Sequence, residues 1–331
     1  LTPLHSALGR RHVSSASSIY RSVCSAGGIR GKSRQGQLPL HVALENRADI
    51  SVIQELLTAY PESIQEVYKG FLPLHIALDA KSPLDVIKLL VQYYPESLCR
   101  RSINGQTALH HAVAIRPKLD YIKFIYEGYP DASNHKCQAG KLPLHLALES
   151  QVLDEIIQYL CEQNPNSIQT ISLTGNFPLH TALAKHYSYT TISHILDTCP
   201  NIAKVRDSTD VLPLRLAIKE RLGNNIVLEL LHHYPDGCRD IDEYDRYPIH
   251  YAASRNYSEE VIHALITIFP SAIKMVDKHG QLPLHISMVH QDNYDVIQYL
   301  LQYYAEATLI SDDKGYLPLH YGIENMYEPD V

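Results

Sequence analysis

The side chains best suited to chemistry in this sequence are its histidines. The chain has nineteen histidines in 331 residues, and nine of them recur in one motif. Imidazole can bind a metal ion or transfer a proton near neutral pH. The motif histidines occur once per repeat, so layers stacked about 10 Å apart would keep neighbouring rings from sharing an ion. This regularity favours a structural role. The nine are His5, His41, His75, His110, His145, His180, His250, His285 and His320.

The pair His232–His233, followed by Cys238, comes nearest to a metal-binding cluster. Adjacent helical residues point about 100° apart, and no further Cys or His follows at zinc-finger spacing. We interpret the pair as a solvated helix end. Cys161 and Cys199 replace apolar residues in a repeating helical pattern, so we expect them to be buried rather than nucleophilic.

No other catalytic pattern stands out. The sequence has no phosphate-binding loop, no dinucleotide-binding glycine motif and no Gly-x-Ser-x-Gly nucleophile motif. The acidic pairs Asp312–Asp313 and Glu259–Glu260 are interpreted as ordinary charged groups in loops or at a helix start. The sequence therefore predicts a chain that is not an enzyme, with no catalytic residue, no cofactor and no metal.

The motif Leu-Pro-Leu-His returns about every 35 residues along the whole chain. Its proline position is occupied by Pro3, Pro39, Pro73, Ala108, Pro143, Pro178, Pro213, Pro248, Pro283 and Pro318. From Ala108 onward every step is 35 residues. A fixed period of this length is typical of stacked repeats, because each unit is too small to bury its apolar face alone. We therefore look for function on the long surface that stacking creates.

Each repeat predicts two helices. Proline fits the first turn of a helix, and in one copy Leu74 and Leu78 then lie on one apolar face. A polar break leads to a second helix with an apolar face from Val86 to Tyr94, which Pro95 ends. A connection of about ten residues follows, with Gly near its tip. Each repeat is therefore expected to be a helix, a turn and a helix.

The sequence resembles the ankyrin repeat, whose first helix opens with Thr-Pro-Leu-His-x-Ala. The copies here read Leu38-Pro39-Leu40-His41-Val42-Ala43 and, once, Thr2-Pro3-Leu4-His5-Ser6-Ala7. The resemblance implies an all-α, ankyrin-type α-solenoid of stacked helix-turn-helix repeats with short hairpin-like connections. The period is 35 rather than 33, and Leu replaces most of the capping threonines, a loss of about 1 kcal/mol per helix. We expect the motif histidine to satisfy nearby backbone groups instead, and whether the connections form true β-hairpins stays open.

The two ends of the chain depart from this pattern. Residues 1–36 are predicted to be a degenerate N-terminal repeat or cap, and residues 37–331 an array of eight full repeats plus a partial C-terminal repeat. Six basic residues and no acidic residue precede Glu45. A basic arm for an acidic partner is the less favoured interpretation of that segment. The half-repeat after Gly315 would expose Leu319 and Ile323. It is either a short cap or, as we favour, the start of an array that continues beyond Val331.

In the ankyrin family, partners bind the connection tips and the exposed side of the first helix, which together line a concave groove. The resemblance therefore implies partner-binding residues at the matching positions of this chain. At the tips these are Gln37, Lys69, Phe71, Asn104, Gln106, Lys141, Asn176, Tyr244, Arg246, His279, Gln281 and Tyr316. At the ends of the first helices they are Glu45, Asn46, Asp79, Glu149, Lys185, Arg255 and His290. We expect Phe71, Tyr244 and Tyr316 to be exposed aromatic anchors.

Composition narrows the range of partners. The net charge of −7 and the pI near 6.2 argue against non-specific nucleic-acid binding. The sequence contains no run of 18 apolar residues, so it predicts no membrane-spanning helix. The six cysteines form no C-x-x-C pair and favour an intracellular, cytoplasmic protein, with the nucleus as an alternative.

The predicted function is a non-catalytic scaffold that binds one or more proteins along the concave face. The alternative is a regulatory or targeting segment of a larger enzyme or channel.

Overall fold

The computed structural model describes residues 28–115, 117–255, 257–289 and 294–327. All regular structure in these ranges is helical, without a β-strand, as the all-α prediction requires. The chain divides into two compact units, Leu1–Leu173 and Thr174–Val331, which we call unit 1 and unit 2. Each unit is a stack of helix pairs. The boundary predicted at residue 36 is not the division between these units, and it stays a prediction.

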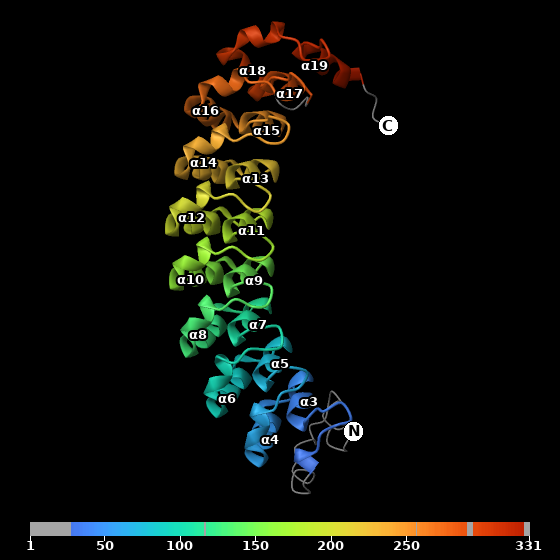
Figure 1. The fold of residues 1–331 in the computed structure, drawn as a ribbon, viewed down its shortest axis with the longest axis vertical. Coiled ribbons are helices and arrows are strands. Elements are labelled where there is room, and N and C mark those ends of the chain that lie inside the picture. The colour runs from blue at the N-terminus through green and yellow to red at the C-terminus, as the bar shows by residue number, and fades with distance from the viewer. Residues whose placement is uncertain (1–27, 116, 256, 290–293, 328–331) are drawn as a thin grey trace. The chain divides into compact units, whose positions relative to one another are not determined.

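Unit 1 contains four helix pairs, each made of a short first helix and a longer second helix. The first helices are α3 (Pro39–Glu45), α5 (Pro73–Asp79), α7 (Ala108–Ala114) and α9 (Pro143–Glu149). The second helices are α4 (Ile50–Ala59), α6 (Leu84–Tyr93), α8 (Leu119–Gly128) and α10 (Asp154–Gln163). Consecutive first helices pack on one another, and the second helices form a separate layer (Figure 1). A turn of 3-10 helix, η1 (Gly28–Arg30), precedes the first pair.

Unit 2 repeats the same two layers. Its first helices are α11 (Pro178–Ala184), α13 (Pro213–Lys219), α15 (Pro248–Ser254), α17 (Pro283–Met288) and α19 (Pro318–Tyr327). Its second helices are α12 (Tyr189–Thr198), α14 (Asn224–His233), α16 (Glu259–Ile268) and α18 (Tyr294–Tyr303). Four pairs are complete, and α19 packs on α17 without a second helix of its own among the described residues.

The apolar pattern of each repeat forms the core between the two layers. In the second helix α4, Val52, Ile53, Leu56 and Leu57 are all buried, as the sequence predicts. The small residue of the motif, such as Ala77 in α5, is completely buried where neighbouring first helices approach. Burying a leucine or isoleucine side chain stabilises a fold by about 2 kcal/mol. Each repeat buries several such side chains, so the repeating core is a large favourable contribution to stacking.

The prolines that follow the second helices do more than end them. Seven of the eight short 3-10 helices that follow a second helix begin at such a proline, because a fixed φ suits the first turn of a helix. The sequence analysis did not predict these turns. They are η2 (Pro61–Gln65), η3 (Pro95–Leu98), η4 (Pro130–Asn134), η5 (Pro165–Gln169), η6 (Pro200–Lys204), η7 (Pro235–Arg239), η8 (Pro270–Lys274) and η9 (Ala305–Leu309).

The connections that lead to the next repeat form narrow loops rather than paired strands. The one β-bridge among the described residues joins Tyr68 to Phe71. Elsewhere two backbone hydrogen bonds close the loop, such as the 3.0 Å bonds from Asp277 N to Gln281 O and from Gly280 N to Asp277 O. One backbone hydrogen bond joins neighbouring tips within a unit, for example the 3.1 Å bond from Asp313 N to His279 O. The 35-residue repeat therefore joins its units through loops with few hydrogen bonds, instead of hairpins of paired strands.

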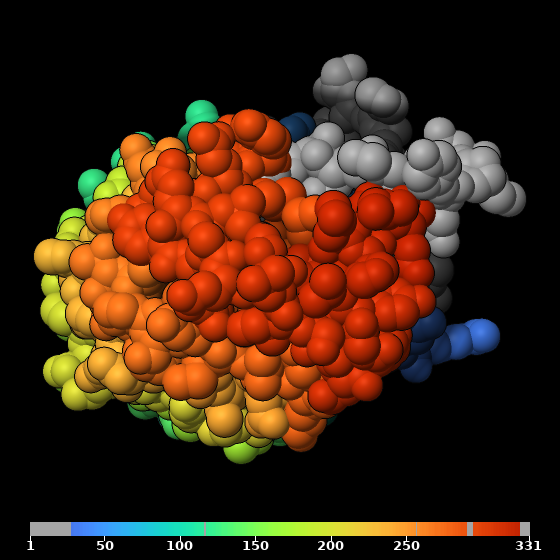
Figure 2. All heavy atoms as spheres, turned by 90° about the horizontal axis from the view of Figure 1, so that it is seen from above, coloured from blue at the N-terminus to red at the C-terminus, as the bar shows by residue number. Residues whose placement is uncertain are grey.

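The end of unit 2 exposes apolar side chains, as expected for a half-repeat. Leu319 in α19 is 61% exposed and Ile323 is 47% exposed. Figure 2 looks onto this end of the unit, where α18 and α19 form the surface nearest the viewer. Equivalent positions in the preceding helices, such as Leu284 in α17, are buried by the next repeat.

Candidate partner-binding surface

The motif histidines cap the first helices, which confirms the role expected for them. The Nδ1 atom of His145 accepts a hydrogen bond of 3.2 Å from the backbone N–H of Leu142, the residue before the motif proline. The same bond, 2.8–3.3 Å long, occurs at six further repeats. The imidazole therefore satisfies an N–H group at the start of the helix, close to the position where the family's threonine acts.

The second ring nitrogen ties the helix to the connection that follows its repeat. His145 Nε2 lies 2.9 Å from the carbonyl oxygen of Thr170, and His41 and His250 contact the carbonyl at the same spacing of 25 residues. His110, His180 and His285 contact instead the carbonyl 31 residues on, which also lies in the connection. An acceptor Nδ1 and a donor Nε2 define one neutral tautomer. Burial lowers the pKa of His75, His110 and His250 to about 4. These three rings are therefore uncharged at neutral pH, which fits a structural role.

Arg215 performs only the second of these tasks in the one described repeat that lacks the histidine, because a guanidinium donates hydrogen bonds and cannot accept one from the helix-start N–H. Its guanidinium donates hydrogen bonds of 2.8 Å to Ile241 O and 2.5 Å to Asp210 O. The buried carboxylate of Asp240 pairs with Arg215 at 3.3 Å and with Arg206 at 2.6 Å. A charged side chain is tolerated here because a buried partner neutralises it.

Four aspartates anchor connection tips, and the sequence analysis missed them. The carboxylate of Asp242 accepts hydrogen bonds from the N–H groups of Tyr244 and Arg246, and from the Tyr251 hydroxyl. Burial alone would raise the pKa of Asp242, but these bonds outweigh it and lower the pKa. The equivalent residues are Asp207, Asp277 and Asp312. Their regular 35-residue spacing in the sequence could have identified these aspartates as structural residues. Asp312 is therefore not the ordinary loop charge that we expected.

The structure brings four predicted partner-binding residues of unit 1 together. Glu45, Lys69, Phe71 and Asp79 line a 320 Å³ pocket, here called the acidic pocket, whose remaining walls are Tyr68, Ile76 and Ala80. Gln37 Nε2 donates to Glu45 Oε2 at 2.8 Å, and Asp79 Oδ1 lies 2.7 Å from His111 Nδ1. Hydrogen bonds therefore hold both carboxylates in a lining that also contains aromatic and aliphatic side chains.

Three predicted residues of unit 2 meet in a second pocket. Arg246, Arg255 and Gln281 line a 280 Å³ hollow between α15 and α17, here called the arginine pocket, with His250, Tyr251, Ser254, Ile286 and Val289. Arg246 pairs with buried Asp277 at 3.1 Å. Arg255 forms no ion pair among the described residues.

Exposure differs from expectation at three predicted positions. Gln37 is buried, because its side chain turns toward Glu45 instead of solvent. Phe71 and Tyr316 are half-buried rather than exposed: Phe71 packs edge-on against His111, and Tyr316 contacts the rings of His320 and Tyr321. Tyr244 is exposed as expected.

The remaining predicted residues do not line either pocket. Asn46, Asn104, Asn176, Lys185 and His279 are exposed, and Gln106 is half-buried. Lys141 and Glu149 pair with each other at 2.8 Å across the start and end of α9. His290 lies outside the described residues. We call the first-helix ends and the connection tips together the helix-one surface.

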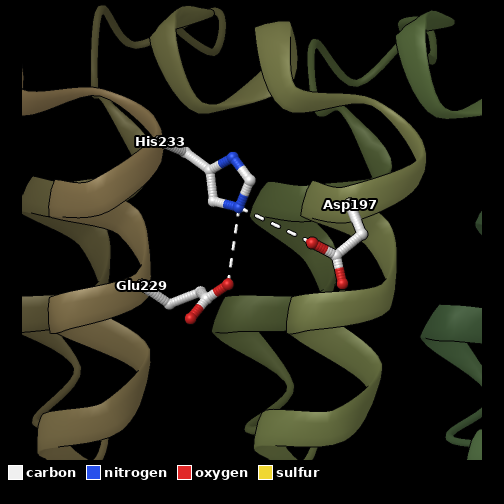
Figure 3. A group of neighbouring side chains, drawn as sticks. All are labelled: Asp197, Glu229 and His233. Carbon is white, nitrogen blue, oxygen red and sulfur yellow. Dashed lines mark ion pairs between the residues drawn. The ribbon is translucent and has the colours of Figure 1, made fainter.

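The other candidates for chemistry have separate surroundings. Cys161 and Cys199 are buried, as expected, and burial raises the pKa of the Cys161 thiol to about 12. Cys238 is also buried, whereas His232 is exposed. His233 is only half-buried, but its neighbours are acidic: Figure 3 shows its Nε2 atom facing Asp197 and Glu229. The description of this pair as a solvated helix end therefore fits His232 and not His233.

Comparison with known proteins agrees with the class of fold seen here, an α-solenoid of stacked helix pairs. A family model of ankyrin repeats (three copies) matches residues 74–171, 214–311 and 249–329, which together exceed half of the chain. The chain belongs to the ankyrin-repeat family. Ankyrin repeats are generally protein-interaction modules, and their fold is typically non-catalytic.

A solved structure shares this fold. The ankyrin repeat domain of human ASB11, a crystal structure, is 16% identical over 70% of this chain and 98% of that chain, with a TM-score of 0.55. At this identity the likeness concerns the fold alone. A search of curated protein sequences found no match. None of the helices in the described ranges is both long and apolar enough to cross a bilayer.

Proposed function

We propose that this chain is a non-catalytic scaffold whose helix-one surface binds a partner protein. The observation that carries the proposal is the gathering of seven tip and helix-end residues into two pockets of opposite charge. Their volumes are suited to one or two side chains rather than to a cofactor. Hydrogen bonds hold the carboxylates of Glu45 and Asp79 in place, which keeps this surface ordered before a partner binds.

The chemistry of the pockets defines the side chains that fit them. The acidic pocket has two carboxylates and one ammonium group, that of Lys69, whose Nζ atom lies 5.1 Å from the centre of the Tyr68 ring. Its excess of negative charge beside Phe71 suits the stem and charge of a lysine or arginine. The arginine pocket offers a guanidinium fork, which suits a carboxylate. We therefore propose a partner segment that carries basic and acidic side chains.

Charge reversal tests this proposal. The bait would carry Glu45→Lys and Arg255→Glu, and a matched control would carry Lys88→Glu and Glu155→Lys, two exposed positions on second helices. Capture from native lysate should retain a protein on the unchanged chain and on the control. The pocket variant should lose that protein by roughly tenfold or more, because like charges would then meet in the pockets.

Circular dichroism would first establish that the three baits are equally folded. Retention of the same proteins in equal amounts by both variants would contradict the proposed surface. Empty lanes for all three baits would instead favour the alternative, in which the chain is a regulatory or targeting segment of a larger enzyme or channel.

A further inference from the structure

We propose that Asp197, Glu229 and His233 form a zinc site that links two neighbouring repeats of unit 2. Asp197 lies near the end of α12, whereas Glu229 and His233 occupy successive turns of α14 (Figure 3). One ligand atom from each side chain lies within 4.8 Å of the other two. The site belongs to the second-helix layer and does not involve the helix-one surface.

The distances suit a shared ion better than direct contacts. His233 Nε2 lies 3.4 Å from Glu229 Oε1 and 3.9 Å from Asp197 Oδ1. Both separations exceed the usual hydrogen-bond range of about 2.7–3.2 Å. Zinc binds nitrogen and oxygen ligands at about 2.0–2.2 Å, so two ligands of a tetrahedral ion lie about 3.4 Å apart. Asp197 would have to move closer to the other two ligands to complete the set.

The donor set also suits zinc chemically. A neutral imidazole and two carboxylates supply three ligands and two negative charges, and water can take the fourth position. The side chains of His233 and Glu229 are 12% and 20% exposed, whereas that of Asp197 is 68% exposed. One side of the site is therefore buried and the other is open to an entering ion.

A neighbouring hydroxyl group holds the Glu229 carboxylate in place. Ser193 Oγ lies 3.4 Å from Glu229 Oε1 and 3.5 Å from Asp197 Oδ2, and both distances exceed the usual hydrogen-bond range. The Tyr189 hydroxyl donates a 3.0 Å hydrogen bond to Glu229 Oε2, which leaves Oε1 directed toward His233. Partners of this kind orient metal ligands and tune affinity. Tyr189 is a positioning residue in this proposal.

Zinc titration of chelator-stripped protein tests the site. Asp197→Asn changes an exposed side chain and keeps its volume, so it should fold. We expect it to weaken the tightest zinc binding by about tenfold or more, and Tyr189→Phe to weaken it less. His233→Ala should abolish one equivalent of binding. His232→Ala removes the adjacent, exposed imidazole and should leave that equivalent unchanged.

Thermal melting gives an independent measure. Because zinc would bind the folded repeats and link α12 to α14, saturating zinc should raise the melting temperature of the unchanged chain and of His232→Ala, but not of Asp197→Asn. Equal zinc binding and equal melting shifts in Asp197→Asn and His232→Ala would overturn the proposal. Stabilisation by magnesium but not by zinc would overturn it as well.

Discussion

At the scale of single residues, the motif histidine is both a helix cap and a link to the connection that follows its repeat. Replacing His145 with alanine removes its bonds to Leu142 N and Thr170 O and leaves a cavity. We expect a loss of about 2–4 kcal/mol in the free energy of unfolding, since a buried N–H then lacks an acceptor.

Urea denaturation followed by circular dichroism would measure this loss. His232→Ala serves as the control, because that ring is exposed and its removal should change stability by less than about 0.5 kcal/mol. If His145→Ala melts like the unchanged chain, the capping role is wrong.

Residue-scale prediction from the sequence worked where a side chain's role depends on its own repeat. The repeating pattern places Leu56 and Cys161 in the core because each faces the opposite layer of its own helix pair. It could not place His233 beside Asp197, because these residues meet only after two repeats stack. The burial of Gln37 depends likewise on the reach of its side chain toward Glu45, which spacing does not record.

At the scale of elements, glycine shapes the connection tips. Gly280 has φ +72°, and a Cβ atom there would lie 2.8 Å from the backbone nitrogen of Asp313 in the next tip. Gly315 has φ +79° with open space around it. Alanine at either position incurs a backbone strain of about 1 kcal/mol. We expect Gly280→Ala to lose about 1 kcal/mol more than Gly315→Ala, because its methyl group also forces the tips apart.

Chemical denaturation of the two variants in parallel isolates the tip contact, since backbone strain is common to both. Equal losses would show that neighbouring tips separate at little cost. The sequence predicted the glycine-containing tips. It did not predict the 3-10 turns, and it left open whether the connections form hairpins.

At the scale of the whole molecule, the buried histidines predict a loss of stability in mild acid. The folded pKa of His75, His110 and His250 is about 4, below an unfolded value near 6.5. The unfolded chain therefore binds more protons between these values. Stability is fully present above pH 6.5 and falls progressively toward pH 4. One pKa unit corresponds to about 1.4 kcal/mol, so we expect a loss of several kcal/mol.

Urea titrations at pH 7.5, 6, 5 and 4.5 would measure this dependence. The anchoring aspartates contribute in a separate window. The pKa values of Asp207, Asp242 and Asp312 lie below 3.8, so the stability that they add is present above pH 3.8 and is lost at lower pH. A free energy of unfolding that stays constant from pH 7.5 to pH 5 would contradict the histidine assignment.

The small number of polar contacts between neighbouring tips has a mechanical consequence. Within each unit, the helices are held by broad apolar contacts. Successive tips are joined by few bonds, such as the backbone bond from Lys278 N to Tyr244 O, the bond from the Lys278 side chain to Glu243 O and the Arg246–Asp277 ion pair. Under a stretching force, we expect the tips to part first while the helix layers stay in register. The helix layers would then resist stretching, whereas the distance between successive tips would change more easily. A bound segment could therefore increase or decrease the spacing of the tips without disrupting the helix layers.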